Sequence, residues 1–64
     1  MIKVTRLNGT EYFVNPHLME SIEETPDTVI TFTTGKKFVV EEKAGQVVEE
    51  IIAYRLAIHN AVMH

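Results

Sequence analysis

Two short segments near the start of the chain alternate apolar and polar positions. Residues 2–7 and 10–14 are rich in β-branched and aromatic side chains, and the pair Asn8-Gly9 separates them. A period of two is typical of a half-buried strand, and Asn-Gly suits the positive φ angles of a two-residue type I′ turn. The pattern therefore predicts an antiparallel hairpin over residues 2–14.

A two-residue turn also predicts the register of this hairpin. It places Val4 opposite Phe13 and Arg6 opposite Glu11. We expect Ile2, Val4 and Phe13 to face the core, and we expect Arg6 and Glu11 to form a cross-strand ion pair at the surface.

Proline and acidic residues interrupt the alternation after residue 14. Asn15-Pro16 ends the second strand, because proline donates no hydrogen bond to a ladder. Residues 18–24 place Leu18 and Ile22 among acids, which predicts a weak third strand at a sheet edge. Residues 25–28, Thr-Pro-Asp-Thr, predict a tight turn.

A second hairpin is predicted over residues 28–40, with a loop at residues 34–36. A three-residue loop sets Ile30 opposite Val40 and Phe32 opposite Phe38. A two-residue loop would instead set Phe32 opposite Lys37. Apolar pairing across the strands favours the three-residue loop.

From residue 44 to residue 63 the apolar period lengthens to about 3.6, which predicts a C-terminal helix. Four acids lie toward its start, where they complement the helix dipole: Glu41, Glu42, Glu49 and Glu50. An inner stripe is expected to cover the sheet and consists of Val47, Ile51, Tyr54, Ile58, Ala61 and Val62. Beside it runs an outer stripe of Val48, Ile52, Leu56 and Met63. One small sheet cannot cover both stripes, so the outer stripe needs a partner.

These segments together predict an α+β fold, in which a small antiparallel sheet of four or five strands packs against one C-terminal helix. We expect residues 1–64 to form a single domain, with the sheet in residues 1–42 and the helix in residues 43–63. A chain of 64 residues without cysteine has a small core and no disulfide to reinforce it. Self-association is therefore expected to add stability.

Charge and hydropathy limit the classes of partner. The chain has 9 acidic against 6 basic residues and a formal charge of -3 at pH 7. Binding to nucleic acid by counterion release requires a positive field, so no nucleic-acid partner is expected. No apolar run approaches the roughly 20 residues that cross a bilayer, and residues 1–6 have neither the long apolar region nor the cleavage site of a signal peptide. We therefore expect no direct membrane insertion and a cytoplasmic location.

Residues with catalytic or metal-binding chemistry are scattered along the sequence. His17, His59 and His64 lack the spacing of a metal-binding pair. Ser21 has only the single aspartate, Asp27, as a conceivable triad partner, and the three glycines form no phosphate-binding loop. We therefore expect a protein that is not an enzyme and holds no cofactor or metal.

Two sequence segments resemble a known family. TRLNG at residues 5–9 and TPDTVIT at residues 25–31 form a specific pair at this separation. With Phe13, Asn15 and the glycine-lysine hairpin at residues 35–37, the chain resembles the FlbD family of small bacterial flagellar proteins up to about Tyr54. That family includes proteins named SwrD. The resemblance implies a cytoplasmic protein, or one peripheral to the flagellar motor at the inner membrane, that motility requires and that acts on the motor or its stator.

The resemblance offers no catalytic residues, so candidate contacts come from side chains that turn geometry does not explain. Asn8-Gly9 and Pro26-Asp27 are what two tight turns require. Arg6, Asn15 and Thr25 have no such role and are candidate contacts with a flagellar motor or stator protein. For a homo-oligomer joined through the C-terminal helix, the candidate interface residues are Val48, Ile52, Leu56, Met63 and Arg55.

An alternative reading comes from the order of the elements. Five short strands followed by one helix also resemble the CsrA type of dimeric, post-transcriptional RNA-binding regulator. An RNA reader needs lysine and arginine gathered on one surface, whereas here the basic residues are scattered among nine acids. The charge pattern therefore favours a protein-interaction module.

Overall fold

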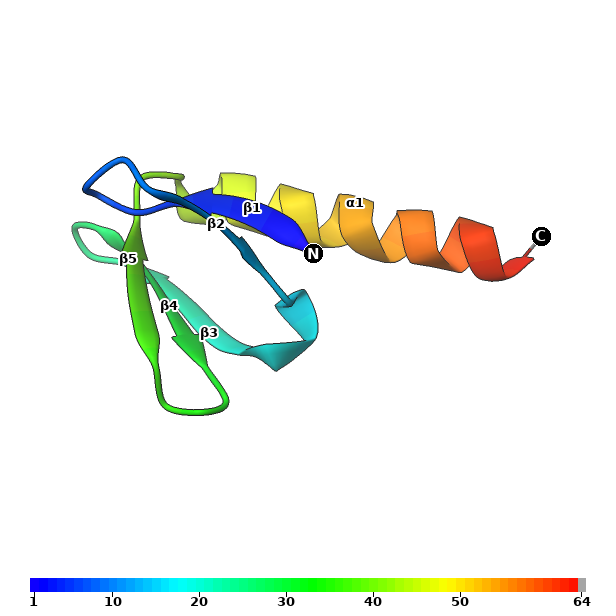
Figure 1. Cartoon of the computed structure of the whole chain (residues 1–64), viewed down its shortest axis with the longest axis horizontal. Helices are drawn as coiled ribbons and strands as arrows, with labels where there is room; N and C mark the ends of the chain where they lie inside the picture. The colour runs from blue at the N-terminus through cyan, green and yellow to red at the C-terminus, as the bar shows by residue number, and fades with distance from the viewer. Residues whose placement is uncertain (64) are drawn as a thin grey trace.

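The computed structural model describes residues 1–63, with side chains for residues 1–60. The elements follow the order β1 (Ile2–Thr5), β2 (Glu11–Val14), the 3-10 helix η1 (Pro16–Leu18), β3 (Met19–Glu24), β4 (Thr28–Phe32), β5 (Lys37–Val40) and α1 (Ala44–Met63). Figure 1 shows the strands gathered at one end of the molecule and α1 projecting beyond them. The α+β class and the C-terminal helix are confirmed.

The strands form two antiparallel sheets, so the prediction of a single sheet is wrong. One sheet pairs β1 with β2, and the other has the order β3-β4-β5. A single bridge between Arg6 and Val40 joins them. Between β2 and β3 the chain passes through η1, which begins at Pro16, and β3 then pairs with β4 and not with β2.

The first hairpin has a three-residue loop, and its predicted register is wrong by one residue. Val4 lies opposite Tyr12, not Phe13. The Arg6 N–H donates to the Thr10 carbonyl, and the Gly9 N–H donates to the Arg6 carbonyl, both at 2.8 Å. Within this loop only the glycine has a positive φ, 87°, as in a type I turn followed by a left-handed residue.

The one-residue shift exchanges the faces of β2. Val14 takes the core position opposite Ile2, and Phe13 is turned outward with 68% of its surface exposed. The predicted ion pair between Arg6 and Glu11 is also wrong. The Glu11 carboxylate instead lies 3.2 Å from the Lys3 ammonium group, in an exposed pair that adds little stability.

The second hairpin has a loop of the expected length that begins one residue early, at residues 33–35. Ile30 therefore lies opposite Phe38, not Val40, and the predicted pairing of Phe32 with Phe38 is wrong. Gly35 ends the loop with a φ of 90°. Each residue of β4 thus pairs with the residue two positions earlier in β5 than predicted. Because side chains alternate between faces, a shift of two leaves each side chain on its predicted face. The rings of Phe32 and Phe38 therefore still meet, with centroids 5.3 Å apart.

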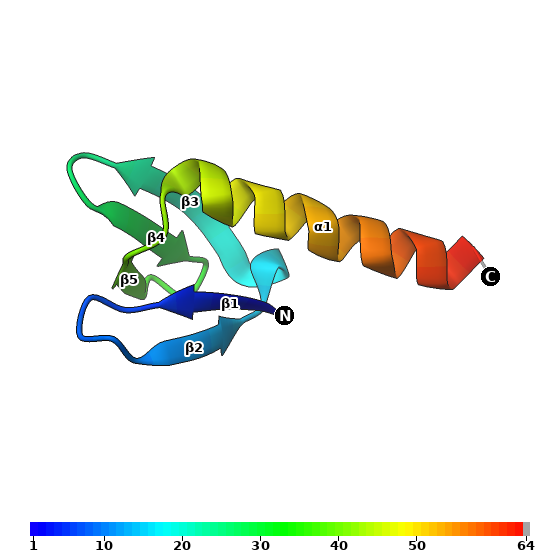
Figure 2. The ribbon, with the colours of Figure 1, turned by 90° about the horizontal axis from the view of Figure 1, so that it is seen from above.

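The core lies between the two sheets and α1. It consists of Ile2, Val4, Val14, Ile30, Phe32, Val40 and Val47. α1 contacts β1 and β3 and closes the space between them, as Figure 2 shows from above. The predicted bounds of the helix are confirmed.

Only the first half of the inner stripe covers the sheets. Val47 is buried, Ile51 and Tyr54 pack against the core, and Ile58 is exposed because the helix extends past the ends of the strands. The side chains of the last two members of the stripe, at positions 61 and 62, lie outside the described residues.

A residue distant in sequence caps the start of α1. The first turn holds no acidic residue. The Glu24 carboxylate, at the end of β3, accepts the Ala44 N–H at 2.7 Å. The Gln46 side chain accepts the Lys43 N–H at 2.8 Å, which is half of a capping box. Backbone N–H groups at the start of a helix have no carbonyl partner within the helix, and side chains here accept hydrogen bonds from two of them.

Glu42 fastens the segment before α1 to the end of β1. Its carboxylate accepts the Thr5 N–H at 2.8 Å, and the Glu41 N–H donates to the Thr5 carbonyl at 2.8 Å. Partial burial raises the pKa of the Glu42 carboxyl, but the hydrogen bonds from Thr5 and the charge of Lys3 outweigh it and leave the pKa lowered. The ionised form therefore stabilises the folded chain.

This lowered pKa predicts a pH-dependent contribution to stability. In the interval between the native and unfolded pKa values the unfolded chain binds more protons, so the free energy of unfolding rises with pH there. The contribution of Glu42 is present above its unfolded pKa and is lost as pH falls through the lowered native pKa. We expect wild type to exceed Glu42→Gln in urea midpoint at neutral pH, with the difference vanishing in acid. A difference that is the same at every pH would contradict this role.

Candidate interaction surfaces

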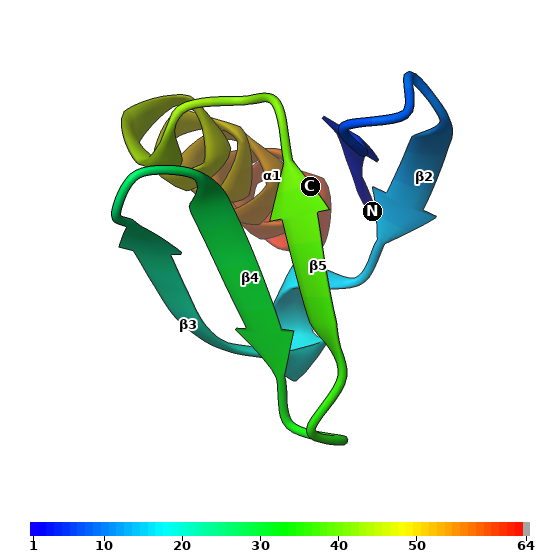
Figure 3. The same ribbon diagram turned by 90° about the vertical axis from the view of Figure 1, so that its left-hand side faces the viewer.

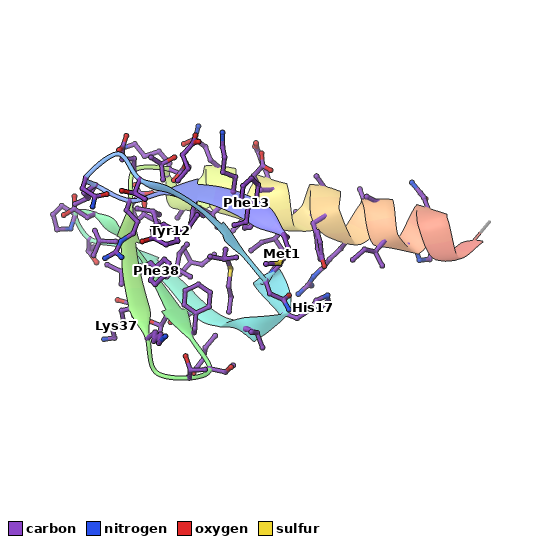
Figure 4. All side chains as sticks on the ribbon, in the orientation of Figure 1. Met1, Tyr12, Phe13, His17, Lys37 and Phe38 are labelled. Carbon is purple, nitrogen blue, oxygen red and sulfur yellow. The ribbon has the colours of Figure 1, made fainter. Side chains whose placement is uncertain are left out.

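Arg6 lies in the contact between the two sheets. Its guanidinium carbon is 4.9 Å from the centroid of the Phe38 ring and 5.6 Å from that of Tyr12. The two rings meet edge to face at 5.4 Å, and Figure 4 shows them side by side. Cation–π contacts of this kind contribute about 0.5–1 kcal/mol at exposed sites. This predicted partner-contact residue therefore has a structural role as well.

The other two predicted contact residues lie apart from each other. The Asn15 side chain accepts the His17 N–H at 3.0 Å and so caps η1. Thr25 is exposed in the turn between β3 and β4, where its N–H donates to the Asp27 carbonyl at 3.3 Å. Asn15 thus has a structural role as the cap of η1, whereas the side chain of Thr25 remains available to a partner.

The two motif segments that carry the family resemblance meet in space. Leu7, from the first segment, lines a surface pocket of about 230 Å³ together with Pro26 and Asp27, from the second. The remaining lining residues are Glu24, Thr28, Val40, Glu41 and Lys43. The sequence analysis did not predict that the two segments meet.

The outer stripe is exposed along α1, as predicted. Val48, Ile52 and Leu56 have 44%, 52% and 57% of their surfaces exposed. They recur every four residues, which places them on one side of the helix. Arg55 is exposed beside them, whereas the side chain of Met63 lies outside the described residues. Each such apolar side chain would contribute about 1.5–3 kcal/mol on full burial, so this surface favours association.

A second apolar surface, which we call the interlayer groove, was not predicted. It has a volume of about 250 Å³ and is lined by Val14, Asn15, Leu18, Phe32, Thr34, Lys36 and Phe38. These residues come from the end of β2, from η1 and from the β4–β5 hairpin. Leu18, which the sequence pattern places in a strand, instead lies in η1 with an exposed side chain, and it is the apolar residue that could have indicated this groove.

Over the part of the chain that the structure describes, three or more metal-ligating side chains are nowhere grouped closely enough to hold a metal ion. Within the same residues, α1 is not apolar enough along its length to cross a membrane.

Comparison with known proteins agrees with the resemblance seen in the sequence. The family model FlbD, described as flagellar and swarming motility proteins, matches residues 1–59. The match includes both motif segments, and it extends past Tyr54, so that it also covers Leu56. No curated protein and no solved structure matches the chain. The family match gives no support to the alternative of an RNA-binding regulator.

Proposed function

Because the chain belongs to the FlbD family of flagellar and swarming motility proteins, we propose that it is a non-enzymatic interaction module supporting the flagellar motor or its stator from the cytoplasm. The observation that carries this proposal is the exposed outer stripe on a helix that projects beyond both sheets. An apolar face of this kind serves association with another protein surface.

The outer stripe joins copies of the chain into a homo-oligomer. Side chains spaced by four residues form a ridge that packs into the groove of a second helix. By the helical period, Glu49 and Arg55 lie on opposite sides of this ridge, where opposite charges can select the direction of pairing. A closed symmetric assembly is the default for such an interface.

The strand end of the molecule then faces the motor or stator protein. Arg6 and Thr25 lie in this part of the chain, next to Leu7 and Pro26 of the pocket shared by the two motif segments. The helix and the strands thus serve different partners. Variants in α1 therefore test self-association, and variants at the strand end test contact with the motor or stator protein.

A motility experiment tests the proposed function. In a strain lacking the gene, complementation with wild type should restore swarming, whereas Leu56→Asp should not. Ala57→Asp adds the same charge one residue further along α1, outside the outer stripe, and should restore swarming. Flagella should be assembled in every strain, and torque on tethered cells should fall with Leu56→Asp. Loss of the filaments themselves would contradict a role at the motor or stator. Full torque with Leu56→Asp would contradict the requirement for the outer stripe in that role.

A further inference from the structure

The interlayer groove combines a buried apolar base with exposed apolar walls. Val14 and Phe32 are almost fully buried at its base, while Leu18 is 47% exposed at its rim. Phe38 forms the facing wall and is held in place by its contacts with Phe32 and Tyr12. A volume of about 250 Å³ lies below the roughly 300–1,000 Å³ of small-molecule sites and suits one large side chain.

A free strand edge runs beside this groove. β5 pairs with β4 along one edge, and on its other edge the described pairing is the single bridge between Val40 and Arg6. Figure 3 shows that no strand lies beside β5 near the hairpin tip on that side. Backbone groups of β5 alternate in direction, so those of Lys37 and the N–H of Val39 point away from β4 and are available to an added strand.

The charge around the groove is opposite to that of the protein as a whole. Lys36 lines the groove, and the Arg6 guanidinium lies over the Phe38 ring. In the described part of the chain no acidic residue lines it, although the formal charge of the protein is -3. The groove therefore presents an apolar pocket beside positive charge.

We propose that the interlayer groove binds an extended segment of a partner protein that carries a large apolar side chain next to carboxylates. The segment pairs with the free edge of β5, its apolar side chain enters between Leu18 and Phe38, and a carboxylate meets Lys36. The β5 edge of a second copy of this chain would bind poorly, because it would place the lysines of one β5 against those of the other. This surface is separate from the outer stripe.

Selection of peptides against the full-length chain tests the proposal. From a phage library of random peptides, we expect enrichment of peptides in which Leu, Ile, Phe or Met neighbours Asp or Glu. A fluorescent copy of an enriched peptide should bind about tenfold more weakly to Lys36→Glu and to Leu18→Ser, because each variant removes one part of the recognition. Both positions are exposed, so the fold is expected to survive, which circular dichroism checks.

Two variants outside the groove serve as matched controls. Lys43→Glu makes the same charge reversal elsewhere, and Ile58→Ser removes an exposed apolar side chain of α1 that belongs neither to the groove nor to the outer stripe. Both should bind within about twofold of wild type. Absence of enrichment, enrichment of basic peptides, or equal binding to all four variants would overturn the proposal. These binding results do not depend on motility, so they stand or fall separately from the proposed function.

Discussion

Ile30→Ala is expected to leave the chain largely unfolded. Ile30 lies at the centre of β4 with none of its surface exposed, and it belongs to the core shared by both sheets and α1. Replacing a buried isoleucine by alanine costs about 2–5 kcal/mol, because a cavity replaces the lost side chain. A single core of this size supplies no more than about 3–5 kcal/mol in total. Urea denaturation followed by circular dichroism measures the loss.

Phe13→Ala is the matched control for this prediction. It removes a larger side chain, but Phe13 is exposed on the outer face of β2, so the free energy of unfolding should change by no more than about 0.5 kcal/mol. The register predicted from a two-residue turn would make Phe13 part of the core. A loss with Phe13→Ala as large as that with Ile30→Ala would therefore favour that register and contradict the observed one.

Leu56→Asp is expected to convert the homo-oligomer to monomers. The change places a charge in the centre of an apolar contact, where an unpaired carboxylate is strongly disfavoured. It also removes about 1.5–3 kcal/mol of apolar burial from each copy. Light scattering should give a multiple of the chain mass for wild type and the mass of one chain for the variant. The Tm should rise with protein concentration for wild type and stay constant for Leu56→Asp.

Ala57→Asp serves as the control for assembly as well as for motility. Both positions are exposed in the single chain, so neither substitution disturbs the core. The control should retain the mass and the concentration-dependent Tm of wild type. A wild-type chain that is monomeric, with a Tm independent of concentration, would contradict the assembly and leave the outer stripe to a different protein.

Local sequence determined the secondary structure and one of the candidate surfaces. The helix was predicted with its observed bounds, because a sustained period near 3.6 has few competing interpretations over this length. Both hairpins were predicted for the same kind of reason, since alternation and glycine at a turn are local features. The outer stripe followed from the helical period alone, and the family followed from two motif segments whose residues are read directly along the chain.

The tertiary structure decided how these elements meet. The register of the first hairpin depended on which side chain of β2 would be buried against Ile2, and the core selected Val14 over Phe13. The choice of two sheets over one depended on the pairing of β3 with β4 and not with β2. Neither decision is encoded in a single short segment, because each depends on packing between elements that are distant in sequence.

The cap of α1 and the two pockets also depend on packing between elements that are distant in sequence. Glu24 and Ala44 are twenty residues apart, and their hydrogen bond forms only after β3 and α1 have packed together. The pocket lined by Leu7 and Pro26 and the interlayer groove also draw their residues from several elements. Sequence by itself determined the hairpins and the C-terminal helix, the exposed stripe and the family of this protein. Long-range contacts decided its register, its sheet division and the shape of its pockets, because those depend on side chains that become neighbours only in the folded chain.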